Sequence, residues 1–97
     1  MITISFNKES SNWNNSKDWN MLFLGTTKDY FNDLIKYRGY LYLRDVYEYL
    51  SIPCNPDVIR EKKLNSILWC QGTKFDFRII KSTDDEIVLE LLNYIVE

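Results

Sequence analysis

The stretch Arg38–Leu50, RGYLYLRDVYEYL, carries the signals of three successive elements. Gly39 can adopt the positive φ angle that ends a helix. Residues 40–43 alternate aromatic and aliphatic side chains, which is typical of a strand whose two faces differ. The apolar residues of 45–51 return to helical spacing. We therefore expect a helix that ends before Gly39, a strand over 40–43 and a helix over 45–51.

Two apolar runs upstream of this stretch favour strands. Residues 1–6 alternate apolar and hydroxyl side chains, so the apolar ones share one face of a strand. Residues 7–18 are rich in Asn and Ser and indicate a loop. Residues 19–24 form the second apolar run. We expect this run to be a strand that pairs with the first and ends at Gly25.

The helix that ends at Gly39 is expected to start near Thr26. The hydroxyls of Thr26 and Thr27 can accept an unpaired backbone N–H, and the carboxylate of Asp29 suits the positive end of the helix. Apolar residues at helical spacing follow as one stripe: Tyr30, Phe31, Leu34 and Ile35.

Downstream, Pro53 ends the second helix because proline cannot continue it. The tripeptide Asn55-Pro56-Asp57 combines a capping residue, a proline at the first helical position and an acid at the positive helix end. A third helix is therefore expected over 56–66. Residues 67–71 suit either a helix end or a strand, and both stay open.

Residues 74–81 and 86–92, joined by the polar turn 82–85, predict a C-terminal β-hairpin. The chain is thus expected to form one small α+β domain over 1–97. It would contain an N-terminal strand pair, two or three helices with a short strand between them, and the hairpin. From residue 26 onward this order matches that of a winged helix.

The composition argues against several classes of protein. With a formal net charge of −2, the chain is a poor non-specific binder of nucleic acid, because phosphate contacts need an excess of Lys and Arg. No segment is apolar for long enough to span a membrane, and the first residues lack a signal-peptide pattern. Cys54 and Cys70 form no CxxC pair, so we expect reduced thiols in a protein of the bacterial cytoplasm.

An enzyme is not expected. The chain has no His, the residue that most often serves acid–base catalysis. Cys54 has no base to activate it, and the three glycines form no phosphate-binding loop. The carboxylates of Asp84, Asp85 and Glu86 suit either a divalent cation or, as we expect, a solvated turn. We predict no catalytic residue, no metal and no cofactor.

Aromatic side chains are the candidates for a protein-binding surface. If Leu41 faces the core, Tyr40 and Tyr42 point outward, and helical spacing leaves Tyr49 partly exposed. Trp13 lies in the loop rich in Asn and Ser. Tyr and Trp are enriched at interface hot spots. The alternative is that these rings cover the edge of a small core.

A second candidate surface is basic. The third predicted helix carries Arg60, Lys62 and Lys63, where the recognition helix of a winged helix would lie. The alternative is an ordinary solvated helix face, which the overall acidity favours.

The run from Tyr30 to Leu50 resembles a block of small, functionally uncharacterised phage-encoded accessory proteins. In that block a helix leads to a glycine, a hydrophobic strand and a helix that begins Asp-Val/Leu-Tyr. The matching residues are Gly39, Leu41, Leu43, Asp45, Val46, Tyr47 and Leu50. The resemblance implies an origin in a phage or mobile element. The absence of Ala beside abundant Asn, Ile, Lys and Tyr agrees with an AT-rich genome.

From these observations we expect a phage-type accessory protein that binds and inhibits a host protein, such as a defence nuclease, in the manner of anti-CRISPR proteins. Aromatic anchors would bind the target, while Asp84, Asp85 and Glu86 pair with Arg or Lys of its nucleic-acid groove. The chain would act as a monomer or a homodimer. A winged-helix DNA-binding regulator and a virion or assembly component are the alternatives.

Overall fold

The computed structural model describes residues 1–97, which form six strands and three helices. The strands are β1 (Ile2–Asn7), β2 (Tyr40–Tyr42), β3 (Ile67–Cys70), β4 (Asp76–Ser82), β5 (Glu86–Leu92) and β6 (Ile95–Val96). The helices are α1 (Lys17–Arg38), α2 (Leu43–Tyr49) and α3 (Pro56–Glu61). The α+β class predicted from the sequence is confirmed.

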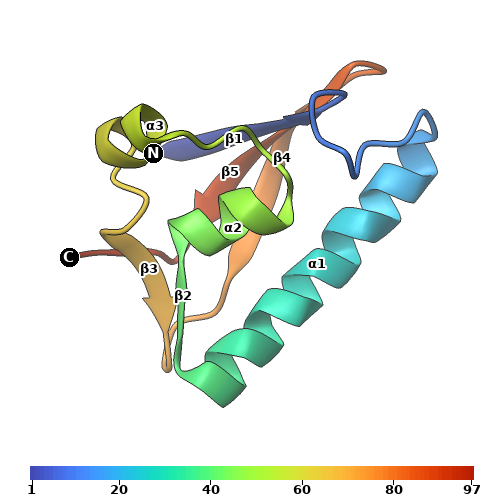
Figure 1. Ribbon diagram of the computed structural model, residues 1–97. Helices are drawn as coiled ribbons and strands as arrows, with labels where there is room; N and C mark the ends of the chain where they lie inside the picture. Colours follow the sequence, from blue (N-terminus) through green and yellow to red (C-terminus); the bar gives the residue numbers. More distant parts are fainter.

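The strands form two antiparallel sheets, ordered β1-β5-β4 and β2-β3-β6. The long helix α1 runs along one flank of the molecule, and the β4–β5 turn lies at the opposite end from β2 and β3 (Figure 1). The core joins both sheets to α1 and α2. Its fully buried side chains include Phe6 of β1, Phe31 of α1 and Trp69 of β3.

The predicted strand over 19–24 is wrong, because these residues belong to α1. The helix is capped by Ser16, whose hydroxyl accepts a hydrogen bond from the backbone N–H three residues later (3.3 Å). The predicted helix start at Thr26 and Thr27 is wrong as well. Both hydroxyls donate to the carbonyl oxygen of Phe23 within the helix, at 2.9 and 2.7 Å.

The reason for this error is that the apolar run and the predicted helix form one continuous amphipathic segment. Leu24, Phe31 and Ile35 are buried at helical spacing. Gly25 does not interrupt the helix, since a single glycine inside a helix costs only about 1 kcal/mol relative to alanine. The predicted N-terminal strand pair is therefore absent, and β1 pairs with β5 instead.

The predicted helix end at Gly39 is confirmed. Its φ angle is 92°, and its N–H donates to the carbonyl of Ile35 (2.9 Å), which closes α1. Strand β2 follows at once. The second helix starts at Leu43, two residues earlier than predicted, because the Asp45 carboxylate accepts the N–H of Tyr42 (2.9 Å) and caps the helix there.

The third helix is present but shorter than the predicted range 56–66. Asn55 caps it by accepting the N–H of Val58 (2.9 Å). It ends at Glu61, and Lys63 then adopts a positive φ of 55° that turns the chain toward β3. The open question over 67–71 is thereby answered, since 67–70 is a strand that pairs with β2.

The predicted C-terminal hairpin is confirmed as β4 and β5. Its pairing differs from that of a winged helix, however. The hairpin adds β1 as its third strand, whereas the short strand β2 pairs with β3 in the other sheet. The order of elements resembles a winged helix, but the hairpin is not a wing beside β2.

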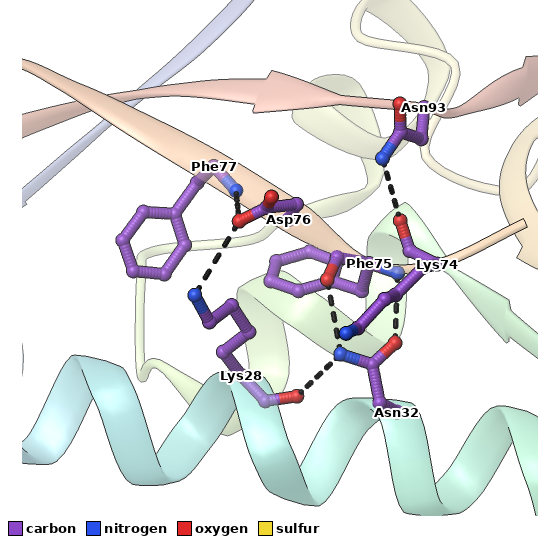
Figure 2. Close-up of polar contacts among 7 residues, drawn as sticks. All are labelled: Lys28, Asn32, Lys74, Phe75, Asp76, Phe77 and Asn93. Atoms are coloured by element: carbon purple, nitrogen blue, oxygen red, sulfur yellow. Dashed lines mark hydrogen bonds and ion pairs between the residues drawn. The ribbon is translucent and has the colours of Figure 1, made fainter.

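Two asparagines of α1 hold neighbouring segments through their side-chain amides. Asn32 donates to the carbonyl of Phe75 (3.0 Å) and accepts the N–H of the same residue (2.9 Å) (Figure 2). The buried Asn20 makes the same pair of bonds with Asn14, at 2.7 and 2.9 Å. These two amide pairs fasten α1 to the segment before β4 and to the N-terminal loop.

Candidate functional site

The four aromatic residues singled out from the sequence lie at three places. Tyr40 and Tyr42 are neighbours on β2, with ring centroids 5.6 Å apart. Tyr49 of α2 is exposed and stacks on Tyr30 of α1 at 4.8 Å. Trp13 is half-buried and packs edge-on against a core phenylalanine at 5.3 Å. The four therefore do not form one surface.

The predicted acidic group lies in the β4–β5 turn, remote from Tyr40 and Tyr42 (Figure 1). Asp84 and Asp85 are exposed, and Asp84 lines a small hollow together with Trp13. Glu86 is already occupied, since it accepts hydrogen bonds from Lys81 (2.9 Å) and from the Ser5 hydroxyl (2.7 Å). These two bonds hold the pKa of the Glu86 carboxyl below its ordinary value of 4.5, and the bond from Lys81 has the larger effect.

Glu86 is expected to make folding stability sensitive to acid. A carboxylate with a lowered pKa in the folded state stabilises it above pH 4.5, and the stabilisation disappears as the pH falls through the folded-state pKa. Glu86→Gln should therefore lose less stability on acidification than the parent chain, as measured by urea unfolding at neutral and acidic pH. Asp85→Asn, which alters the same turn without breaking an ion pair, is the matched control. Equal acid sensitivity of both variants would contradict the assignment.

The largest set of exposed aromatic side chains lies on α1. Trp19, Tyr30 and Tyr37 are separated by about three and about two helical turns of 3.6 residues, so they point in one direction over about 27 Å. Leu22 lies one turn after Trp19. Trp19 and Leu22 are each 57% exposed and Tyr37 is 81% exposed. With Tyr49 beside Tyr30, we call these five residues the α1 face.

Carboxylates flank the α1 face. Asp18, Asp29 and Asp33 are exposed and take part in none of the ion pairs of the structure. Two exposed lysines of α1 accompany them without an ion pair of their own: Lys17, next to Asp18, and Lys36, whose ammonium lies 5.9 Å from the ring centroid of Tyr37. The α1 face thus combines exposed aromatic rings with three unpaired carboxylates and two unpaired lysines.

A chain of stacked rings connects this face to the core. Tyr30 stacks on Tyr49, Tyr49 stacks on Phe23 at 6.3 Å, and Phe23 stacks on the buried Phe6 at 5.6 Å. Rings held in this way lose little conformational freedom on binding, so they are well suited as anchors.

Most of this surface is not among the residues predicted from the sequence. A strand over 19–24 does not place Trp19 and Leu22 in phase with Tyr30 and Tyr37. The signal for the surface is that these four positions are separated by about whole multiples of 3.6 residues.

The predicted basic group is dispersed. Arg60, Lys62 and Lys63 are exposed, but only Arg60 lies within α3, and its guanidinium pairs with Asp57 at 2.7 Å. The helix has six residues, none of them fully buried. The three cations therefore do not line one face of a helix that is held against the core.

Comparison with protein-family models, with curated proteins and with solved structures finds no match. None of the three helices has both the length and the apolar character needed to cross a membrane.

Proposed function

We propose that this chain is a protein-binding inhibitor, of the phage accessory type, that covers a basic nucleic-acid-binding surface of a host protein such as a defence nuclease. The observation that carries the proposal is the α1 face, an exposed row of aromatic anchors flanked by unpaired carboxylates. Inhibition is stoichiometric, because the chain blocks the surface rather than transforming a substrate.

The anchors supply the affinity of the proposed contact. Trp and Tyr contribute most of the binding energy at many interfaces, since they bury large areas and retain a polar group for the rim. Trp19 and Tyr37 lie at the two ends of α1 and are each more than half exposed. They therefore have the most surface to bury on a target.

The carboxylates supply the selectivity. Asp18, Asp29 and Asp33 lack partners within the chain, so each is free to pair with Arg or Lys of a groove that otherwise binds phosphates. Such attraction accelerates association and is screened by salt. The same charges repel DNA and RNA, which disfavours the alternative of direct nucleic-acid binding.

The first test is a double substitution of the end anchors. The chain is expressed in a low-GC bacterium whose CRISPR effectors and restriction nucleases each act on a reporter plasmid, and plasmid survival is measured. Wild type is expected to protect the plasmid from one of these nucleases. Trp19→Ala with Tyr37→Ala should abolish protection, and binding to the purified nuclease should weaken by about 30-fold or more per ring, as expected for hot-spot residues.

Ile80→Ala is the matched control, because Ile80 is an exposed apolar residue of another element, β4, and is no part of the α1 face. Its protection should equal that of wild type. Two results would count against the proposal: no protection from any nuclease, or protection that survives the double substitution. Binding that requires nucleic acid would instead favour the DNA-binding alternative.

A further inference from the structure

A small hollow opens on the surface where the start of β1, the helix α2 and the end of α3 meet. Its volume is about 170 Å³. Most of its lining is apolar, and the lining contains one cation and no carboxylate: Met1, Ile2, Thr3, Leu43, Tyr47 and Lys62. We call it the Tyr47 hollow. It offers a ligand apolar contact and positive charge, and no negative charge.

The hydroxyl of Tyr47 lacks a partner within the chain. Tyr47 is buried, with 7% of its surface exposed, and its hydroxyl makes no hydrogen bond in the structure. The Ser82 hydroxyl is the only side-chain polar atom that is both closed to solvent and unpartnered, so the Tyr47 hydroxyl keeps an open side. Since Tyr47 lines the hollow, this open side faces it. Buried hydroxyls are nearly always hydrogen-bonded, which makes this one a point of attachment for a ligand.

Both polar groups that matter here are hydrogen-bond donors. Burial, and to a lesser extent the nearby Cys54 sulfur, raises the pKa of the Tyr47 hydroxyl above its ordinary value of 10.0. Tyr47 therefore stays protonated at neutral pH and can donate. Lys62 is exposed, takes part in no ion pair and, as an ammonium, donates only. A ligand that satisfies both must bring an acceptor.

We propose that the Tyr47 hollow binds a small organic acid, whose apolar body fills the hollow and whose carboxylate accepts hydrogen bonds from Tyr47 and Lys62. An apolar cavity of about 150 Å³ holds benzene, so the volume of this hollow suits a body of that size. Hydrogen bonds from an ammonium or a hydroxyl to a carboxylate are among the strong ones. The lining disfavours a cation, and a purely apolar ligand would leave the hydroxyl unpaired. This inference does not rest on the proposed inhibitory function.

Benzoate is the first probe, with benzamide as the neutral counterpart of the same shape. Binding is followed by the backbone amide resonances of the whole chain in a two-dimensional NMR titration. Benzoate should move the resonances of Thr3, Tyr47 and Lys62 with a dissociation constant in the millimolar range, as expected for a ligand of about nine non-hydrogen atoms. Benzamide should bind at least about 5-fold more weakly, because it carries no charge to pair with Lys62. Resonances that stay in place at about 50 mM benzoate, or equal binding of both probes, would overturn the proposal.

Single substitutions separate a binding role from a structural one. Tyr47→Phe removes only the hydroxyl and should weaken benzoate binding about tenfold, the size of one hydrogen bond to a charged group. Its urea unfolding should match that of wild type, because the hydroxyl has no partner within the chain. Lys62→Met should reduce the affinity for benzoate to that for benzamide. Lys17→Met removes an equally exposed, unpaired lysine from α1 and should bind like wild type. Benzoate binding that Tyr47→Phe and Lys62→Met both retain would show an adventitious additive only.

Discussion

Replacing Trp69 by alanine is expected to destabilise the fold by about 3–5 kcal/mol, the usual cost of deleting a large core aromatic. Trp69 is fully buried in β3 and packs edge-on against Phe75 at 4.8 Å. Its indole N–H donates to the carbonyl of Leu92 in β5 (2.7 Å), so this one side chain joins the two sheets. Since domains of this size are stable by only about 5–15 kcal/mol, this loss removes a large fraction of the total stability.

Urea unfolding followed by far-UV circular dichroism measures this loss. Trp69→Phe is the informative control, because it keeps most of the ring but removes the donor to Leu92. Its loss should be smaller than that of Trp69→Ala, about 1–3 kcal/mol for the unpaired carbonyl and the lost volume. A Trp69→Ala variant within 1 kcal/mol of wild type, on the order of a surface substitution, would show that the sheets do not depend on this contact.

Asn32→Asp is expected to cost about 2–3 kcal/mol, because it removes the amide donor and places a carboxylate beside carbonyl oxygens. The wild-type amide donates to the carbonyls of Lys28 (3.1 Å) and Phe75 (3.0 Å) (Figure 2). The Lys28 ammonium already pairs with Asp76 at 3.5 Å, so it is not free to compensate the new carboxylate. A lowering of the melting temperature by about 10 °C or more is the expected result.

Asn65→Asp provides the comparison for this substitution. Asn65 is exposed and makes no side-chain hydrogen bond in the structure, so the same chemical change should leave the melting temperature nearly unchanged. If the two variants melt together, the amide pair with Phe75 does not hold α1.

The parts of the fold that could be predicted are those with a local physical cause. Gly39 ends α1 through its own backbone freedom, Asn55 and Pro56 start α3, and the polar turn before Glu86 closes the hairpin. Each of these signals acts within a few residues. They are therefore visible without knowledge of the tertiary structure.

The error over 19–24 has a non-local cause. A short apolar run suits a strand or a buried helix, and periodicity within six residues cannot distinguish them. Tertiary pairing decides between the two structures. Strand β5 pairs along the whole of β1, so β1 does not need residues 19–24 as its partner strand. The partners of β2 could not be predicted for the same reason, since β3 lay in the ambiguous range and β6 gave no signal of its own.

The candidate surfaces depended on these errors. Tyr40 and Tyr42 were placed outward on the strand period alone, and they lie on the outer side of β2. Their neighbours Leu68 and Ile95 come from strands that the sequence did not reveal. Likewise, the acids of the β4–β5 turn were grouped with Tyr40 and Tyr42 of β2, which lies at the other end of the molecule (Figure 1). Of the grouped aromatic residues, Trp13 does lie beside Asp84.

The amide pairs of Asn20 and Asn32 separate two roles of α1. Asn20 binds backbone atoms of Asn14, and Asn32 binds backbone atoms of Phe75. These bonds do not depend on the side chains of Asn14 and Phe75, and neither asparagine belongs to the α1 face. Selection on the outer residues of α1 is thereby uncoupled from selection on how the helix is held. If the proposed function holds, substitutions at Trp19 and Tyr37 change which target is bound and leave the bonds that hold α1 in place.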